Sequence, residues 1–445
     1  MLQPADEELI RRDSMLGTTL TLLLDEEAFT TALQARLPSV TISSLRAVDV
    51  RYAPHTNCLV SYRVVIDGNE LDVYAKGYHS SEFVKAFNGP EDATLALGGG
   101  AFSLHDTAVV VFFFPYDPEL RVLRRLHPSG SKFREKLLRS LLPDHTHLCK
   151  GQIQTLRYKP EQRFAAYLSD SSDAPAAFIK VYNGREFHKA ARAAANFHSD
   201  GPLRIADLLG RSKAQHILAF EWLSGRSLDD LLVHPTTALN LRLTGEALAR
   251  LHAQSPTGLR QQRQVGGALE ETANGIEALI PVKATNFRSL AREISRRLAN
   301  IATQKRSIHG SFHAKHVLVT NEGVALFDFD KAAYGDPVSD LGNFLAHLER
   351  KALFEEMNTN RLAAVRTALL AGYERESECT ISRKILAIHT AAGLMQLTHE
   401  PFRYRQPAWP DRMSAILDRV RELLDCGSNN QATSATYLSN VSAHC

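Results

Sequence analysis

The strongest constraint on the fold is an internal repeat in the first half of the chain. The pattern Arg-Tyr-x-Pro begins at Arg51 and again at Arg157. In both places an alternating apolar stretch follows, and the pattern Lys-x-Tyr-x-x-x-Glu-Phe-x-Lys-Ala then begins at Lys76 and at Lys180. Alternation predicts strands, and a further apolar run closes each copy. The sequence therefore predicts two copies of one unit made of three strands, a helix and a fourth strand.

A second feature is the segment from His309 to His316, which reads His-Gly-Ser-Phe-His-Ala-Lys-His and precedes an Asp-Phe-Asp sequence at 328–330. Between them, two apolar runs about a glycine-containing turn predict a β-hairpin that places His316 opposite Asp328. Asp340, farther along, has the position of a carboxylate that braces the loop from behind. Phosphoryl transfer needs such a convergence, because a metal ion bridges the phosphates while a nearby group orients the attacking hydroxyl.

These motifs resemble those of the aminoglycoside phosphotransferase and choline kinase superfamily. The resemblance implies an α+β, bilobal, protein-kinase-like fold, with a small β-rich lobe and a large helical lobe. It also implies ATP and a divalent ion, Mg²⁺ or Mn²⁺, as cofactors. It makes His309 the structural loop histidine and Asp328 the metal ligand, with Asp330 as a second contact. The expected activity is ATP-dependent transfer of a phosphoryl group to a hydroxyl of a small molecule, for example a sugar-like compound.

The loop departs from the family pattern at two positions. The base aspartate of the family falls on Ser311, and its metal-binding asparagine falls on His316. Serine does not accept a proton at neutral pH without help, and imidazole is a poor magnesium ligand that manganese tolerates better. Loss of general-base help slows a reaction about 100- to 10,000-fold. His313 could take over the proton, or it could be a structural or surface histidine.

Three functional interpretations remain open. The first is a small-molecule kinase with altered catalytic groups, and the second is a catalytically impaired pseudokinase that binds nucleotide or a partner. The third is a metal-dependent hydrolase, because histidines spaced like residues 309, 313 and 316 would share one face of a helix and could bind zinc with Asp328. Gly310 and the β-branched run after the loop disfavour a helix there.

The second copy of the repeat supplies the nucleotide-binding residues that the resemblance implies. Lys180 lies in an apolar strand, where a lysine needs an anionic partner, although a solvated strand lysine is the alternative. The central expectation is that Lys180 and Asp328 meet in one cleft between the lobes. Glu186 is expected to pair with Lys180, or else to complement the dipole of its helix as a first-turn glutamate. The segment that resembles the adenine-binding hinge contains Glu221, Trp222 and Leu223.

A glycine-rich phosphate loop is absent from the second copy. The matching turn there is 159–163, and Lys159 or Arg163 could contact phosphate.

The first copy has no catalytic half of its own, and we therefore expect it to form a cap. The expected domains are an N-terminal cap at 1–149, a kinase-like N-lobe at 150–234, a helical C-lobe at 235–426 and a disordered tail at 427–445. Helical periodicity in the C-lobe predicts helices at 239–252, 286–303, 338–350, 354–375, 382–398 and 409–425.

Composition narrows the choice of partners and compartment. The 445 residues allow two or three domains, and 44% hydrophobic with 23% charged residues is ordinary for a globular protein. A net charge of +3 does not indicate nucleic-acid binding, and no transmembrane run or signal-peptide pattern occurs. Five scattered cysteines predict a cytoplasmic protein without a disulfide framework. The basic segment at 399–405 disfavours a polycationic aminoglycoside and suits a neutral or anionic acceptor, or it is a plain surface loop.

Overall fold

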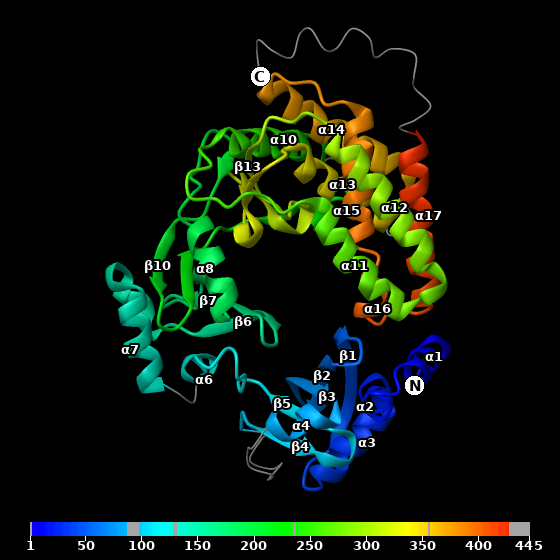
Figure 1. Cartoon of the computed structure of the whole chain (residues 1–445). Helices are drawn as coiled ribbons and strands as arrows, with labels where there is room; N and C mark the ends of the chain where they lie inside the picture. Colours follow the sequence, from blue (N-terminus) through cyan, green and yellow to red (C-terminus); the bar gives the residue numbers. More distant parts are fainter. Residues whose placement is uncertain (1, 87–97, 128–130, 235–236, 355–356, 427–445) are drawn as a thin grey trace.

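The computed structural model describes residues 2–86, 98–127, 131–234, 237–354 and 357–426. The expected tail at 427–445 lies outside these residues. Two antiparallel sheets and a helical region are arranged around the centre of the molecule, with the first sheet opposite the helical region (Figure 1). The mixture of a β-rich lobe and a large helical lobe confirms the expected α+β class, with an extra N-terminal unit.

The N-terminal unit consists of three helices and a five-stranded sheet. The second helix packs against the second and third strands, so the helices cover one face of the sheet. The sheet has the order β1-β2-β3-β5-β4. Its elements are α1 (Pro4–Arg12), α2 (Gly17–Leu24), α3 (Glu26–Arg36), β1 (Ile42–Ala53), β2 (Asn57–Ile66), β3 (Asn69–Tyr78), α4 (Ser80–Ala86), β4 (Ala101–Leu104) and β5 (Val109–Phe113).

A second sheet with the same plan follows a short helical connection. Its order is β6-β7-β8-β11-β10, which repeats the order of the first sheet strand for strand. In both sheets a helix follows the third strand, so the duplication inferred from the sequence is confirmed. The connection contains α6 (Leu123–Leu126), α7 (Ser131–Leu141) and the 3₁₀ segment η3 (Pro143–Lys150); the sheet contains β6 (Ile153–Lys159), β7 (Arg163–Ser169), β8 (Pro175–Tyr182), α8 (Gly184–Ala193), β10 (Leu208–Ser212) and β11 (Ile217–Glu221).

Each unit has one more strand than the sequence indicated. The additional strands, β4 and β10, contain four and five residues and lie at the edges of their sheets. A strand this short gives too few positions for the alternation of apolar and polar residues to be visible. An edge strand also pairs on one side only, so its sequence is less restricted than that of a central strand.

The helical region follows the hinge, except for β9, and carries a small mixed sheet with the order β12-β14-β15-β9, beside the pair β13–β16. The six expected helices are present, and α11 is an additional one whose two consecutive glycines weaken the helical pattern. The elements are β9 (Leu203–Arg204), β12 (Arg226–Ser227), α9 (Leu228–Leu231), α10 (Ala238–Ala253), α11 (Val265–Leu279), α12 (Pro281–Ala299), β13 (Arg306–Ile308), β14 (Val317–Thr320), β15 (Gly323–Leu326), β16 (Ala333–Gly335), α13 (Val338–Leu353), α14 (Thr359–Ser377), α15 (Arg383–Gln396), α16 (Glu400–Arg403) and α17 (Trp409–Cys426).

The N-terminal helices share one hydrophobic core with the helical region. Leu20 and Phe29 belong to the same buried cluster as Phe287 of α12 and Trp409 of α17. At this junction the Asp6 carboxylate accepts hydrogen bonds from Arg405 at 2.6 Å and from the indole of Trp409 at 3.2 Å. The N-terminal unit is therefore packed into the molecule. The exact limits of the four expected domains stay predictions.

Two expectations about the chain as a whole can be compared with the structure. None of the helices among the described residues is long and apolar enough to cross a membrane. Cys58 and Cys149 are free and buried, whereas Cys379 is disulfide-bonded. The sequence predicted no disulfide framework, and Cys379 is nevertheless in a disulfide. Sequence spacing carried no signal for this bond, because the scattered cysteines form no recognisable framework.

Candidate active site

The predicted hairpin is formed by β14 and β15, and it brings the catalytic loop to the carboxylates. Val317 pairs with Leu326, so the residues just outside these strands face each other. Nε2 of His316 lies 3.3 Å from Oδ2 of Asp328. Asp328 has a positive φ of 67°, which is uncommon for a residue other than glycine and occurs often at functional sites. The hairpin geometry inferred from the sequence is confirmed.

Lys180 of β8 meets both carboxylates of the Asp-Phe-Asp segment. Its Nζ donates hydrogen bonds to Oδ1 of Asp328 at 2.9 Å and to Oδ1 of Asp330 at 2.7 Å. Arg163, at the start of β7, donates to Oδ2 of Asp330 at 2.7 Å, and the Tyr182 hydroxyl donates to Oδ1 of Asp330 at 2.8 Å. The expected meeting of Lys180 and Asp328 between the two lobes is confirmed, and two cations face two carboxylates there.

The charges in this array set the protonation of Asp328. Burial alone would raise the pKa of its carboxyl group, but Lys180, His316 and Arg163 hold that pKa well below its usual range. Asp328 is therefore ionised at neutral pH. The Lys180 side chain is only 7% exposed, so the pairing satisfies a buried ammonium that would otherwise carry a large desolvation cost.

Asp340 of α13 braces the catalytic loop from behind, as the sequence indicated. Its carboxylate accepts hydrogen bonds from the backbone N–H of His309 at 2.6 Å and of Gly310 at 2.9 Å. Gly310 has a φ of 75°, and a Cβ atom there would lie 2.1 Å from the carbonyl oxygen of Lys331. Only glycine allows the loop to approach the Asp-Phe-Asp segment this closely. On its far side, the Asp340 carboxylate lies 3.1 Å from Nε2 of His252.

The loop histidines form a stacked group. The His313 ring lies 3.8 Å from the His316 ring and 4.3 Å from the His347 ring, between centroids. Burial, followed by the neighbouring His316 and His347, lowers the pKa of His313 far below its ordinary value. The imidazole is therefore neutral at pH 7, and it is also a weak base. Sequence analysis missed His347, which reaches the loop from α13, because its distance in the chain gave no signal.

The other two histidines are engaged by backbone oxygens. Nε2 of His309 lies 2.9 Å from the carbonyl oxygen of Phe327, and burial lowers the pKa of His309 to about 4. Nδ1 of His316 lies 2.9 Å from the carbonyl oxygen of Ser311. The loop contains only a 3₁₀ turn at its end, so the three histidines do not share a helix face. Among the residues that the structure describes, no group of three or more His, Cys, Asp or Glu could hold a metal ion.

Glu186 does not pair with Lys180. It lies in the first turn of α8, where the Asn183 side chain accepts a hydrogen bond from its backbone N–H, and its own carboxylate pairs with Lys189 at 3.1 Å. The expected Lys180–Glu186 pair is therefore absent, because Lys180 is already paired with Asp328 and Asp330. The first-turn alternative describes the position of Glu186.

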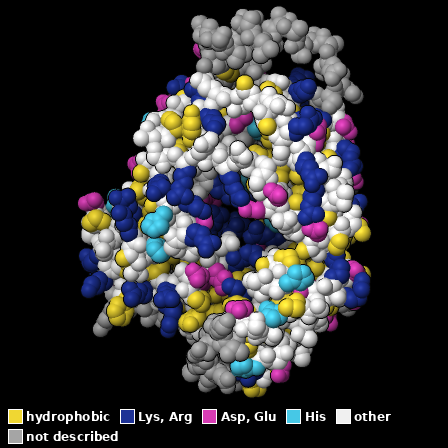
Figure 2. Space-filling view, in the orientation of Figure 1, with side chains coloured by type: hydrophobic (Ala, Val, Ile, Leu, Met, Phe, Trp, Pro, Cys, Tyr) yellow, Lys and Arg dark blue, Asp and Glu magenta, His cyan; other side chains and the backbone are white. Residues whose placement is uncertain are grey.

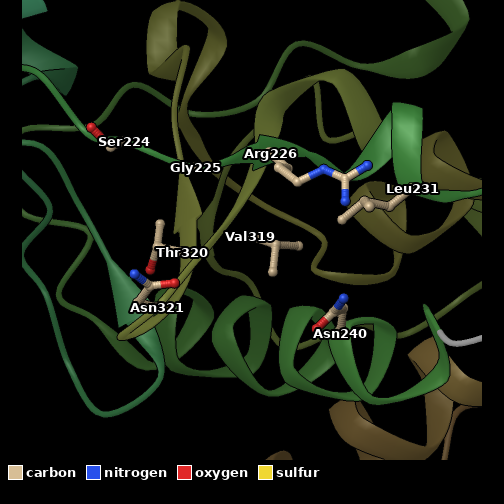
Figure 3. Close-up of a pocket in the computed structure, with 8 residues that line it drawn as sticks. All are labelled: Ser224, Gly225, Arg226, Leu231, Asn240, Val319, Thr320 and Asn321. Atoms are coloured by element: carbon tan, nitrogen blue, oxygen red, sulfur yellow. The ribbon is translucent and has the colours of Figure 1, made fainter. Parts of the chain in front are cut away.

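The hinge segment joins the second sheet to the helical region. Glu221 ends β11, residues 222–225 form no regular element, and the Trp222 ring lies 5.4 Å from the ring of Tyr167. A pocket of about 410 Å³ lies beside the hinge at the turn of the β14–β15 hairpin (Figure 3). His316 and Asp328 flank the opposite end of this hairpin, so the pocket is separate from the carboxylates. It is lined by Ser224, Gly225, Arg226, Leu231, Asn240, Val319, Thr320 and Asn321.

The turn between β6 and β7 is held by the N-terminal sheet, which sequence analysis did not anticipate. Arg51 of β1 donates a hydrogen bond to the carbonyl oxygen of Pro160 at 2.6 Å. Lys76 of β3 donates to Oε2 of Glu161 at 2.8 Å, and the Asp117 carboxylate accepts from the backbone N–H of Glu161 at 2.8 Å. This turn stands where the resemblance would place a phosphate-covering loop, and here it is fixed by side chains from the repeated unit.

A comparison with protein-family models finds a match over the part of the chain that contains Lys180, Asp328 and Asp330. Residues 159–379 match the model of a phosphotransferase enzyme family. The chain therefore contains a phosphotransferase-family domain. The matched range begins at the β6–β7 turn and includes Lys180, Asp328 and Asp340. No curated protein matches the sequence.

Several solved structures are similar to about two thirds of the chain. A choline/ethanolamine kinase family protein from Mesorhizobium loti is 15% identical, covers 65% of this chain and 93% of its own, and has a TM-score of 0.47. Choline kinase LicA from Streptococcus pneumoniae is 14% identical, with coverages of 66% and 99% and a TM-score of 0.43. A putative fructosamine-3-kinase from Thermobifida fusca is 17% identical, with coverages of 65% and 98% and a TM-score of 0.42.

The donor atoms in the phosphotransferase-family domain fit a divalent cation with a preference for oxygen ligands. Asp328 and Asp330 present carboxylate oxygens within reach of one another, because both contact the same Lys180 ammonium. Magnesium and manganese bind such carboxylates together with phosphate oxygens and water.

Proposed function

We propose that the protein transfers the γ-phosphoryl group of ATP to a hydroxyl group of a small molecule, with Mg²⁺ or Mn²⁺ as the cofactor. The observation that carries the proposal is the buried array in which Lys180 and Arg163 face Asp328 and Asp330. In a nucleotide–metal complex, the metal ion can bind the carboxylates, and the phosphate groups can bind the lysine and the arginine. The array contains both kinds of group at hydrogen-bonding distance, in the domain that matches a phosphotransferase family.

The residues of the array can exchange partners when the substrate binds. Asp328 and Asp330 would release Lys180 and Arg163 as they turn to the metal ion. The freed ammonium and guanidinium groups would then hold the phosphate oxygens, where bidentate contacts from arginine are strong. Tyr182 would keep Asp330 oriented through its hydroxyl group, which already donates to that carboxylate. The exchange conserves the number of charge pairs, so it avoids leaving a buried charge alone.

The acceptor side of the reaction depends on positioning more than on a base. The acceptor oxygen forms a bond to the γ-phosphorus while the bond from that phosphorus to the ADP oxygen breaks, and the acceptor proton leaves to solvent or phosphate. Ser311 offers a hydroxyl group that can orient the acceptor, and His313 is a weak base. In a loose transition state, positioning and charge stabilisation carry most of the catalysis. We therefore propose slow turnover, with Ser311 and His313 as orienting groups.

A pseudokinase is the second candidate, because Ser311 and His316 replace the base and the metal-binding asparagine that the resemblance implies. ATP turnover measured with a panel of hydroxyl compounds separates the two candidates. Slow, acceptor-dependent formation of ADP supports the kinase, and nucleotide binding without any turnover supports the pseudokinase. The variant Ser311→Asp sharpens the test, since it restores a base and should raise turnover about 100-fold in a kinase.

The remaining features of the proposal come from the sequence. Residues 221–223 are proposed to bind the adenine through backbone groups, which fits their position between the two lobes. His309 is proposed to be a structural residue of the loop, in agreement with its buried ring and its contact with Phe327. A cytoplasmic location and action without nucleic acid or membrane stay predictions.

A further inference from the structure

A concentration of positive charge lies beside the phosphoryl-transfer array. Figure 2 shows Lys and Arg side chains gathered around a hollow near the middle of the molecule. In the same orientation, Figure 1 draws β6, β1 and α16 along one side of this place and the helical region along the other. The cations come from the second sheet, the catalytic loop, the helices and the N-terminal sheet. They are Arg51, Arg157, Lys159, Arg163, Lys315, Lys331, Arg350 and Arg403. We call this group the basic hollow.

Some cations of the basic hollow have carboxylate partners. Arg403 of α16 pairs with Asp49 at 2.6 Å, and Arg51 lies 3.7 Å from the same carboxylate. Arg350 pairs with Glu400 at 3.3 Å. The Arg403–Asp49 pair joins α16 to β1 of the N-terminal sheet, and the Arg350–Glu400 pair joins α13 to α16, so both hold the frame of the hollow. Arg163 is already paired with the catalytic carboxylates.

Four cations of the hollow have no carboxylate partner among the residues that the structure describes. Arg157, Lys315 and Lys331 are exposed to solvent, and Lys159 is partly buried. Burial, followed by Arg157 and Arg163, lowers the pKa of Lys159 to about 7. Like charges held this close repel one another, so the frame keeps them together at a cost that an anionic ligand would remove.

The unpaired cations adjoin the groups that would perform the transfer. Lys331 directly follows Asp330, and Lys315 directly precedes His316. Arg163 contributes to the electrostatic environment of both Lys159 and Lys331, and it also contacts Asp330. A molecule seated in the hollow therefore has its reactive end next to the carboxylates. A polycationic acceptor would be repelled by the same cations.

We propose that the basic hollow binds the phosphoryl acceptor, and that this acceptor is a small hydroxyl compound that also carries a phosphate or carboxylate group. The proposal deepens the proposed function and rests on it. Lys331, Lys315 and Lys159 bind the anionic group, and this contact places a free hydroxyl toward Ser311. The N-terminal unit is part of the acceptor site, because Asp49 of β1 holds Arg403 at its rim.

The test measures binding with the nucleotide site already filled. The full chain is saturated with ADP and Mn²⁺, and dissociation constants are measured for glucose 6-phosphate, gluconate, glucose and kanamycin. The expected order is tight binding of the phosphate or the carboxylate compound, and at least tenfold weaker binding of glucose and kanamycin. Preference between glucose 6-phosphate and gluconate identifies which anionic group the site takes.

Variants locate the binding to the hollow. Lys331→Gln and Lys315→Gln should each weaken binding of the preferred anion about tenfold, since one charge-assisted contact is lost. The affinity for ADP and Mn²⁺ should change less than threefold. Lys136→Gln, on the exposed surface of α7, removes a lysine outside the hollow and should leave anion binding unchanged.

Two results would overturn the inference. One is equal or tighter binding of glucose or kanamycin than of the anionic compounds. The other is an equal loss of anion binding in Lys136→Gln, which would indicate nonspecific attraction. Failure of ADP and Mn²⁺ to bind at all would instead contradict the proposed nucleotide site, so the two failures are distinguishable.

Discussion

The two sheets of this protein have the same strand order and carry a lysine at the same position, yet the two lysines have different partners. Lys180 of β8 is paired with Asp328 and Asp330 in the helical region. Lys76 of β3 is paired with Glu161, in the turn of the other sheet. The lysine of the second copy thus lies in the proposed nucleotide and metal site, whereas the lysine of the first copy supports the turn beside that site.

The surroundings of the two lysines explain why we expect Lys180 to contribute more to folding stability than Lys76. The Lys180 side chain is 7% exposed and faces two carboxylates, whereas the Lys76 side chain is 20% exposed and faces one. Each ammonium also lies near the tyrosine two residues along its strand, at 5.1 Å from the Tyr182 ring and 5.4 Å from the Tyr78 ring. The lysine-bearing strand therefore has the same Lys-x-Tyr arrangement in both copies. The segment that supplies the carboxylate partner of the lysine differs between them.

The largest expected effect comes from Lys180→Met. This change leaves Asp328 and Asp330 buried with one cation, so the free energy of unfolding should fall by about 3–5 kcal/mol and nucleotide binding should be lost. Denaturant unfolding and binding of a fluorescent ATP analogue measure the two effects. A loss of stability below about 1 kcal/mol would show that the buried pairing is not a major contribution.

The second-largest expected effect is a loss of folding stability in acid, caused by protonation of Asp328. The folded-state pKa of Asp328 is depressed below its ordinary value of 3.8, so its contribution to stability is present above that value and is lost as pH falls toward the folded-state pKa. The free energy of unfolding of the wild type should therefore fall more steeply below pH 4 than that of Asp328→Asn. Parallel curves from pH 5 to pH 3 for the two proteins would contradict the pairing.

A smaller effect is expected for Lys76→Met. The pair with Glu161 is partly exposed, so its loss should cost about 1 kcal/mol of stability. Because the β6–β7 turn then loosens, the affinity for ATP should weaken about threefold to tenfold. A double-mutant cycle with Glu161→Gln checks that the two residues act together, and the exposed pair member Lys189→Met is a matched control. Independent, additive effects of Lys76→Met and Glu161→Gln would exclude the supporting role.

The smallest effect is expected for Lys159→Met in the same turn. The pKa of Lys159 is lowered from 10.5 to about 7 in the folded protein, so the unfolded chain binds more protons and this lysine destabilises the fold increasingly as pH falls from 10.5 toward 7. The variant should melt about one degree higher than the wild type, with a larger gain at pH 6 than at pH 9. A gain that does not depend on pH would indicate a packing effect of the new side chain.

Sequence reasoning reached the parts of the site that depend on local pattern. The repeat, the β14–β15 hairpin, the bracing by Asp340 and the meeting of Lys180 with Asp328 all follow from motifs with fixed spacing. It assigned Lys180 a helix partner, Glu186, whereas Lys180 pairs with Asp328 and Asp330 and Glu186 pairs with Lys189. The helix starts at Gly184 as expected, so the miss lies in the choice of partner.

The contacts between segments far apart in the chain could not be predicted from the sequence. His347 reaches the loop from α13, and Lys76 reaches Glu161 from another sheet. No local pattern encodes which surface of a repeated unit will face its neighbour. The basic hollow was indicated only in part, by the charges at 399–405, because its other members are scattered over the second sheet and the catalytic loop.

The most direct test of the account is the thermal unfolding of the full chain with ATP and Mn²⁺. Because a ligand that binds only the folded state raises its stability, saturating nucleotide and metal should raise the melting temperature by several degrees. The increase should be absent in Asp328→Ala and should persist in Lys136→Gln, whose side chain is exposed on α7. An equal increase in Asp328→Ala, or no increase with any nucleotide, would contradict the assignment of this array as the nucleotide and metal site.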